Sequence, residues 1–338
     1  MKALVTGGCG FIGAHLVKKL VDEGAEVTVV DDLSSGDISN LTDKNLKVRA
    51  VIPSLVSVLH KSESREERDA VVITGDFVDA EVLSHFVDGE YTHVFHLAAN
   101  PRVGFSVEFP AISTETNLMK TVELLSACRK ANIDRFVFAS SSSVYGDVSG
   151  GQKVDATHED ITCNPNSPYG LQKFVCELFM KQFSDLYNID SVALRFFNVY
   201  GPGCTGDNPY ATAVAAWCDK LNSKEMLRSD GDGEQTRDMV YVTDVANALY
   251  TCSTHKDLSG FQYYNIGTES AVSNNEILKM LDEKVGDFGV RNAPERPGDV
   301  KHTLAAVGKI TGDTGWTPKE TFESGLDKTL LWWGLSNG

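Results

Sequence analysis

The sequence predicts an α/β fold: a doubly wound parallel sheet with a smaller, loop-rich C-terminal lobe. Apolar, strand-like runs recur through the N-terminal part of the chain and are separated by helix-length segments, at residues 70–73, 93–98, 135–140 and 192–196. This alternation is typical of βαβ units, in which the strands are parallel. The runs are almost continuously apolar, which indicates that helices cover both faces of the sheet.

After about residue 196 the composition changes, because glycine and proline gather in segments that favour loops, at 201–203, 206–209 and 231–233. A helix is still expected after Ser273, which forms a capping-box pattern with Glu276. We therefore expect residues 1–195 to form the sheet domain, with later returns near 239–265, and residues 196–338 to form mostly the smaller lobe. The stretch 46–70, with its dense charge run, is expected to be a surface helix or an ordered excursion with a solvated charged face, and no function is assigned to it.

A turn with spaced glycines follows the first expected strand, residues 3–5, and opens a helix; these glycines are Gly7, Gly10 and Gly13. Such glycines let the chain bend sharply, let the backbone approach a pyrophosphate, and let the helix pack close to the strand. The helix N-terminus adds free N–H groups and a partial positive charge. A second strand, residues 27–30, ends at Asp31, 18 positions after Gly13 and close to where a ribose-binding acid is expected. Together these features predict a dinucleotide site.

The residues around Asp31 favour NAD over NADP as the dinucleotide. Asp32 adds a second carboxylate, and no Lys or Arg follows until Lys44. Two adjacent carboxylates would repel a 2′-phosphate group. Residues 1–195 are therefore expected to form a Rossmann-type NAD-binding domain, with ligands beyond the carboxyl ends of its strands.

The composition excludes several classes of partner. A net charge of −16 over 338 residues argues against nucleic acid and anionic membranes, both of which bind positive surfaces. The seven cysteines are scattered without a CxxC pair, so we expect reduced thiols in the cytoplasm and no metal site. We expect no signal peptide, because Met1 and Lys2 lead straight into a strand, and no apolar run approaches the ~18 residues of a membrane span.

Tyr169 and Lys173 are four residues apart on a helix that Ser167 and Pro168 are expected to open, so the two side chains share a face. A phenol titrates near pH 10, and to act as a base near neutrality its pKa must fall by about 3, which corresponds to about 4 kcal/mol. A neighbouring ammonium supplies part of this stabilisation, and a positive nicotinamide ring adds more. Ser141, at the end of an expected strand, can hydrogen-bond a substrate oxygen and relay its proton. After a dinucleotide turn, these residues predict a catalytic site.

Several motifs resemble those of the extended short-chain dehydrogenase/reductases. They are the glycine turn, Asp31, Gly75-Asp76, His96-Leu97-Ala98-Ala99, the run from Ser140 to Gly146, and Tyr169 with Lys173. Three further segments, 194–202, 237–242 and 296–299, narrow the resemblance to the NAD-dependent sugar epimerase/dehydratase family, closest to its UDP-glucose 4-epimerases. The resemblance covers nearly the whole chain, although the stretch 46–70 is longer than the family usually carries.

The resemblance implies a role for each matching residue. Those that would hold the pyrophosphate of NAD are Gly7, Gly10, Phe11, Ile12 and Gly13. The other residues that would contact NAD are Asp31 at the adenosine ribose, Asp76 and Phe77 at the adenine, Ala98 and Ala99 at the nicotinamide, and Lys173 at the nicotinamide ribose. Tyr169 would be the base, assisted by Ser141. The residues that would bind the nucleotide sugar are Ser141, Ser142, Asn198, Arg237, Arg296 and Thr303.

By the same resemblance, the two arginines in that set would lie at the diphosphate. This fits the charge argument, because a protein of net charge −16 needs permanently charged, planar donors to hold such a group. The alternative for Arg237 and Arg296 is surface pairing with Asp238 and Asp299.

The reaction implied by the resemblance is a 4-epimerisation through a transient 4-keto sugar. Dehydratases and decarboxylases of this family usually carry an acid just before the Val-Tyr-Gly of the serine run, whereas Ser142 and Ser143 stand there in this chain. No carboxylate is thus on hand for an elimination, which leaves oxidation and re-reduction. In this hypothesis Tyr169 takes the proton of the sugar 4-hydroxyl while hydride leaves C4 for NAD+.

UDP-glucose and UDP-galactose are the expected substrate pair. Thr303 occupies a position where some members carry a bulky tyrosine, so by resemblance UDP-GlcNAc and UDP-GalNAc also fit. A UDP-glucuronate epimerase, a GDP-sugar epimerase, a reductase and a non-catalytic NAD-binding scaffold or sensor remain alternatives. The family often dimerises by pairing two long helices from each subunit. The helices expected at about 114–131 and from 168 onward are the candidates for a homodimer interface.

Overall fold

The computed structural model describes residues 1–55, 68–89, 91–148, 155–205, 213–295 and 300–335. The described chain divides into two compact units. The first unit comprises Met1–Ser141, Ser167–Arg195 and Ala246–Tyr264, and the second comprises Ser142–Asn166, Phe196–Val245 and Asn265–Gly338. Residues 142–166, which the sequence assigns to the sheet domain, thus belong to the second unit.

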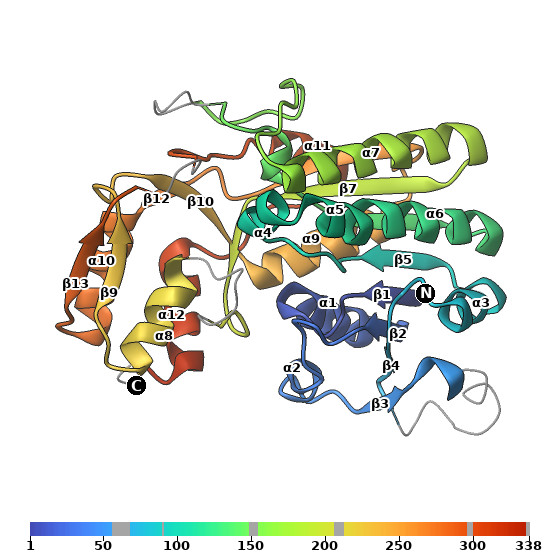
Figure 1. Ribbon diagram of the computed structural model, residues 1–338, viewed down its shortest axis with the longest axis horizontal. Helices are drawn as coiled ribbons and strands as arrows, with labels where there is room; N and C mark the ends of the chain where they lie inside the picture. The colour runs from blue at the N-terminus through green and yellow to red at the C-terminus, as the bar shows by residue number, and fades with distance from the viewer. Residues whose placement is uncertain (56–67, 90, 149–154, 206–212, 296–299, 336–338) are drawn as a thin grey trace. The chain divides into compact units, whose positions relative to one another are not determined.

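The first unit contains an eight-stranded sheet in the described residues, with the order β11-β7-β6-β5-β1-β2-β4-β3. Its strands are β1 (Lys2–Thr6), β2 (Glu26–Asp31), β3 (Val48–Val51), β4 (Ala70–Thr74), β5 (His93–His96), β6 (Arg135–Ser141), β7 (Asp190–Phe196) and β11 (Phe261–Ile266). From β6 across to β3, neighbouring strands pair in parallel. The predicted α/β fold with a parallel sheet is confirmed (Figure 1).

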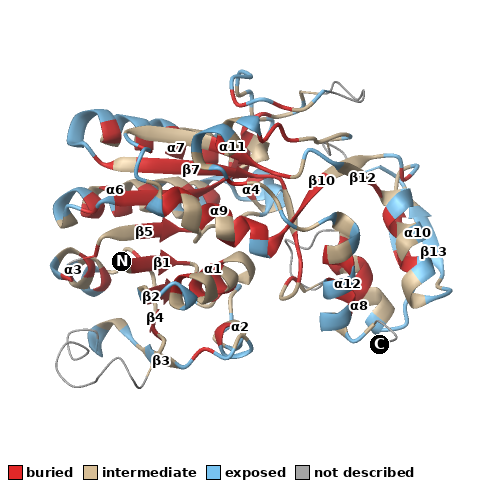
Figure 2. Cartoon of the chain, turned by 180° about the vertical axis from the view of Figure 1, so that it is seen from behind, coloured by how far each residue is buried: buried red, intermediate tan, exposed pale blue. Residues whose placement is uncertain are grey.

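Helices cover this sheet, and in the chain they lie between the apolar runs that form its strands. They are α1 (Phe11–Asp22), α2 (Ser39–Thr42), α3 (Ala80–Asp88), α4 (Val103–Glu108), α5 (Pro110–Thr114), the π-helical segment η3 (Glu115–Met119), α6 (Lys120–Ala131), α7 (Pro168–Tyr187) and most of α9 (Val242–Thr254). Helices α3, α6 and α7 pack on the sheet in one apolar cluster that includes Phe86, Leu124 and Phe136. Strands β1 and β7 are almost wholly buried, as helices on both faces require (Figure 2).

Two expectations about the helices and the stretch 46–70 change. The helix expected from about residue 114 begins at Pro110, which occupies a first-turn position, and it contains the π-helical segment before α6 continues to Ala131. Part of the stretch 46–70 is a strand rather than a surface helix, because β3 pairs with β4 at the edge of the sheet. Residues 56–67 of that stretch lie outside the described residues.

The second unit has a core of its own. Its elements are the 3₁₀ turn η4 (Ser142–Val144), β8 (Asn198–Tyr200), α8 (Ala213–Asn222), β9 (Leu227–Asp230), β10 (Thr236–Tyr241), β12 (Ala271–Ser273), α10 (Asn274–Val285), β13 (Val290–Ala293), α11 (Gly308–Thr314) and α12 (Phe322–Trp333). Strand β10 lies between β8 and β12, and β9 pairs with β13. The predicted capping box opens α10, with the Ser273 side chain accepting from the Glu276 N–H.

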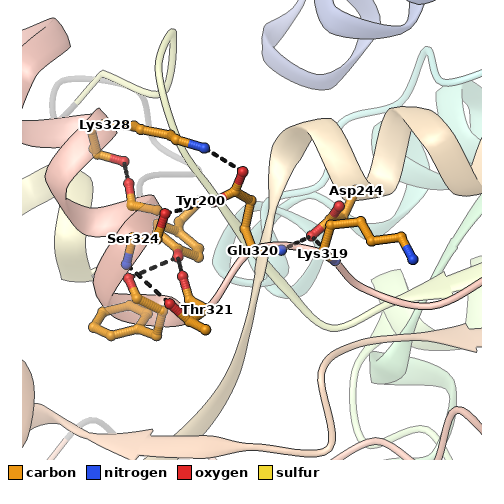
Figure 3. A network of polar contacts seen from close by, with 10 residues as sticks. Tyr200, Asp244, Lys319, Glu320, Thr321, Ser324 and Lys328 are labelled. Carbon is orange, nitrogen blue, oxygen red and sulfur yellow. Dashed lines mark hydrogen bonds and ion pairs between the residues drawn. The ribbon is translucent and has the colours of Figure 1, made fainter.

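A polar network ties the C-terminal segment to the core of this unit (Figure 3). The Asp244 carboxylate accepts hydrogen bonds from the backbone N–H groups of Lys319 and Glu320, each at 3.0 Å. The Tyr200 hydroxyl donates to the Phe322 carbonyl at 3.1 Å, and Lys328 pairs with Glu320. The start of α12 is therefore held by fixed partners on β8 and α9.

Candidate active site

The glycine turn between β1 and α1 has the geometry that a phosphate-binding turn requires. Gly7 adopts a φ of +72°, and a Cβ added there would lie 2.7 Å from the backbone nitrogen of Ala98. At Gly13 a Cβ would lie 2.1 Å from the Gly7 carbonyl oxygen, so only glycine lets α1 pack against the turn. Gly10 is the N-cap of α1 and brings no capping side chain, which leaves the first-turn N–H groups of Phe11 and Ile12 for an external anion.

Asp31, at the end of β2, is fixed by the turn and by its own loop. Its Oδ2 accepts from the N–H of Cys9 at 2.9 Å, and its Oδ1 accepts from the N–H of Leu33 at 3.0 Å. Burial raises the pKa of Asp31, while these two hydrogen bonds act to lower it. Each carboxylate oxygen keeps a lone pair for a further donor such as a ribose hydroxyl. Asp32 is turned into its own loop, where it accepts from the Ser34 N–H and hydroxyl at 2.9 and 2.6 Å.

The residues expected at the adenine and the nicotinamide follow β4 and β5. The Gly75 N–H donates to the Asp31 carbonyl at 3.0 Å, so the loop that carries Asp76 and Phe77 begins beside Asp31. Asp76 forms an ion pair with Lys120 on α6, a partner that the sequence reasoning missed because the two residues are far apart in the chain. Ala98 lies against Gly7, as the short Cβ distance above shows. Ala99 comes directly after it in the loop that follows β5.

Tyr169 and Lys173 lie in the first turns of α7, as the sequence predicts. Ser167 caps this helix by accepting from the N–H of Gly170 at 3.1 Å, and the buried Ser106 hydroxyl accepts from the Tyr169 N–H at 3.1 Å. Both side chains are buried, and the Lys173 ammonium lies 5.9 Å from the centre of the Tyr169 ring. The structure therefore brings the phenol ring and the ammonium together in the same unit as the glycine turn.

The ammonium of Lys173 has a defined environment. Its Nζ donates to the Ala139 carbonyl oxygen at 2.7 Å and lies 4.5 Å from the centre of the Phe138 ring. Burial lowers the pKa of Lys173 to about 8, while the neighbouring Cys176 and Glu177 act to raise it. Ser141 ends β6, two residues after Ala139.

The second unit carries most of the residues expected to contact a sugar nucleotide. The Asn198 amide donates to the Thr303 hydroxyl at 3.3 Å and to the Asp238 carbonyl at 3.4 Å, so Asn198 and Thr303 meet. The Arg237 guanidinium donates to the Thr236 and Lys301 carbonyls at 3.0 and 2.9 Å. Ser142 begins the 3₁₀ turn η4. Arg296 lies outside the described residues.

Asp238, the alternative surface partner of Arg237, is fully buried. Its carboxylate accepts from the N–H groups of Thr268, Glu269 and Ala305 at 2.8, 3.1 and 3.0 Å. Burial raises the pKa of Asp238, and these hydrogen bonds act to lower it. The carboxylate therefore fixes the two loops that follow β11 and precede α11.

The described residues fit a bound NAD. The turn is lined by glycines where a Cβ would collide, the N-terminus of α1 has no capping side chain and would accept an anion, and Asp31 stands where a ribose hydroxyl would donate. No group of three or more His, Cys, Asp or Glu residues that could hold a metal ion occurs in the described part of the chain. Among the same residues, no helix has the length and apolar character needed to cross a membrane.

The sequence profile of the NAD dependent epimerase/dehydratase family matches residues 3–267. The chain belongs to this family, which depends on NAD. It is 31% identical over 336 residues to a UDP-glucose 4-epimerase of Mycolicibacterium smegmatis, covering 98% of this chain and 97% of that protein.

Solved structures of the family share the fold over almost the full chain. The UDP-glucose 4-epimerase of Thermotoga maritima with UDP-glucose aligns with a TM-score of 0.85 and 32% identity, over 99% of each chain. A UDP-N-acetylglucosamine 4-epimerase from Methanobrevibacter ruminantium M1, in complex with UDP-N-acetylmuramic acid, aligns with a TM-score of 0.84 and 32% identity. That alignment covers 98% of this chain and 97% of the other.

Gly13→Ala should weaken NAD binding, because the added Cβ would lie 2.1 Å from the Gly7 carbonyl and would force α1 away from the turn. Overpacking of this kind costs about 1–3 kcal/mol, so we expect Kd for NAD+ to rise by about 5- to 150-fold. Calorimetric titration of the purified protein with NAD+ measures this. Gly308→Ala is the matched control, since a Cβ there meets nothing within 4 Å. Wild-type affinity in Gly13→Ala would show that the turn does not hold the pyrophosphate.

Proposed function

We propose that this protein is an NAD-dependent nucleotide-sugar 4-epimerase that interconverts UDP-glucose and UDP-galactose. The observation that carries the proposal is the buried pair of Tyr169 and Lys173, placed on a capped helix in the unit that holds the glycine turn. The chain's family supports the same function. So do the UDP-glucose 4-epimerases to which the chain is about one third identical.

The residues of the first unit would carry the chemistry. Tyr169 takes the proton of the sugar 4-hydroxyl, and the ammonium of Lys173 stabilises the phenolate that does so. Ser141 holds the same sugar oxygen by a hydrogen bond. NAD, when bound, would supply the oxidised nicotinamide ring, an acceptor for the hydride of C4 and the donor for its return. Because Ser142 and Ser143 stand where an elimination would need an acid, these residues support reversible oxidation at C4 and no loss of water.

The residues of the second unit would bind the nucleotide sugar. Asn198 and Thr303 form one polar group, and Arg237 lies on the neighbouring strand β10. A guanidinium can bind a diphosphate through two parallel hydrogen bonds. We assign Arg237 and Arg296 to the diphosphate, with Asn198, Ser142 and Thr303 toward the rest of the substrate.

Tyr169→Phe should lower kcat for UDP-galactose epimerisation by about 10²-fold or more, because the variant loses the group that takes the proton. NMR of the sugar anomeric protons follows both nucleotide sugars in one sample. The absorbance of NADH, followed in parallel, reports stoichiometric NADH consumption, which would identify a reductase. UDP-glucuronate and GDP-sugars belong in the same panel. Near-wild-type turnover in Tyr169→Phe would contradict the assignment. A wild-type protein that binds NAD and turns over none of these substrates would instead be a scaffold or sensor.

A second candidate substrate pair is UDP-GlcNAc and UDP-GalNAc. The side chain at position 303 is a small threonine whose hydroxyl accepts from Asn198. A small residue here leaves room for a 2-N-acetyl group, and one of the solved structures with the same fold is a UDP-N-acetylglucosamine 4-epimerase.

Thr303→Tyr should reduce kcat/KM for UDP-GlcNAc by about tenfold or more relative to its effect on UDP-glucose, because the bulky ring takes the space of the N-acetyl group. Parallel progress curves with the two substrates measure the ratio. Thr303→Ser, which keeps the hydroxyl and the small size, is the control. An equal loss on both substrates would place Thr303 away from the 2-position of the sugar.

We also propose that the protein is a homodimer formed through α7 and the contacting helices α5, η3 and α6. Large apolar side chains are exposed on this run of contacting helices: Ile112, Met119, Leu171, Leu178 and Leu186. An apolar face of this kind is typical of a protein–protein interface. A cytoplasmic location is supported by the seven cysteines, none of which forms a disulfide, and fractionation of expressing cells tests it.

Leu178→Glu should convert the dimer to a monomer, since it places a charge in the apolar face of α7, where Leu178 is 48% exposed. Sedimentation velocity measures the change as a fall in mass by half. Leu331→Glu is the control, because Leu331 is equally apolar and 67% exposed but lies on α12 of the second unit. A wild-type protein that sediments as a monomer would overturn the proposal.

A further inference from the structure

A buried charged cluster lies one helical turn beyond Lys173. Glu177 is 2% exposed and accepts from the Nε and Nη2 of Arg195 at 3.0 and 2.6 Å. Its Oε1 also accepts from the hydroxyl of Ser140 at 2.5 Å. Arg195 is equally buried, and its guanidinium lies 4.5 Å from the centre of the Tyr263 ring. The cluster therefore joins α7 to the three adjacent strands β6, β7 and β11.

The cluster and the candidate catalytic residue Lys173 contact the same end of β6 from the same face of α7. Consecutive residues of β6 bind residues four apart on α7: the Ala139 carbonyl accepts from Lys173, and the Ser140 hydroxyl donates to Glu177. The next residue of β6 is Ser141. Because Tyr169, Lys173 and Glu177 follow one another at intervals of four residues, they share one face of the helix. A movement of Glu177 would shift both α7 and the end of β6.

Stability alone gives a weak reason for such a cluster. In a buried ion pair the cost of desolvation often offsets the gain in attraction, and apolar residues of similar volume often stabilise a core equally well. The cluster therefore calls for a function beyond packing.

The groups that face Lys173 supply such a function. On its own helix they are Tyr169, Cys176 and Glu177, and from β5 it is His96, which is kept neutral because burial and the charge of Lys173 lower its pKa to about 3. From β7, Arg195 reaches Glu177. Glu177 is thus a carboxylate that opposes the loss of the Lys173 proton.

We propose that Glu177, held by Arg195 and Ser140, is a positioning residue that fixes Lys173 against β6 and keeps its ammonium charged beside Tyr169. The inference rests on the proposed roles of Tyr169 and Lys173. Glu177 acts through Lys173 and is not itself placed at the substrate.

Glu177→Gln on the NAD-loaded protein tests the proposal, since it keeps the size of the side chain and removes its charge. Loss of a nearby carboxylate makes Lys173 easier to deprotonate, so its titration, followed by NMR of ¹³Cε-labelled lysine, should move by about one pH unit toward acid. The alkaline limb of the kcat profile should move with it, while KM changes less. Lys173→Arg assigns the resonance. Asp22→Asn is the control, because Asp22 pairs with Lys18 four residues away but on an exposed helix face.

Glu177→Gln leaves Arg195 buried without its partner, so it can fail to fold. The double variant Glu177→Met/Arg195→Met removes both charges and keeps an apolar core. The proposal predicts a wild-type urea midpoint with a titration of Lys173 that is still displaced toward acid. A wild-type titration and pH profile in the folded double variant would overturn it. If the wild-type protein turns over no nucleotide sugar, the proposed function fails, and the lysine titration still decides the role of Glu177.

Discussion

The proposed site depends on the contacts of the buried Lys173 ammonium. Moving such a charge into the interior is costly unless it is paired and hydrogen-bonded. The carbonyl of Ala139 and the face of the Phe138 ring compensate at short range, and the carboxylate of Glu177 adds an opposing charge on the same helix. In the mechanism that we propose, this ammonium stabilises a phenolate at Tyr169, which an unassisted tyrosine forms only near pH 10.

The parallel sheet explains why the candidate residues come together. Its strands end at one edge, so Gly7 after β1, Asp31 at the end of β2, Ala98 after β5 and Ser141 at the end of β6 stand beside one another although they are far apart in the chain. The glycines then let backbone meet backbone, at Gly7 with Ala98 and at Gly13 with Gly7. Two hydrogen bonds fix where α7 begins: Ser167 caps the helix, and the Ser106 hydroxyl accepts from the Tyr169 N–H. They thereby fix the positions of Tyr169 and Lys173 along the helix.

The features of the fold that depend on neighbouring residues in the sequence could be predicted from the sequence. The parallel sheet, the start of α7 at Pro168 and the capping box at Ser273 follow from the apolar runs and capping residues, and they are confirmed. Pairings across elements left no such signal: Glu177 meets Arg195, and Asp76 meets Lys120, only after helix and strand are packed. For the same reason strand β3, which is short and lies at the edge of the sheet, could not be predicted from the sequence. The membership of residues 142–166 in the second unit depends on such contacts as well.

The most direct test of the central claim is the titration of the Tyr169 phenol itself in the NAD-loaded protein. Ultraviolet difference spectra of the wild type against Tyr169→Phe isolate the absorbance of one tyrosinate as the pH is raised. We expect this difference band to grow in well below pH 10, the range of an ordinary tyrosine, and to move toward pH 10 when Lys173 is replaced by Met. A difference band that grows in only near pH 10, with or without Lys173, would contradict the claim that the ammonium makes Tyr169 a base.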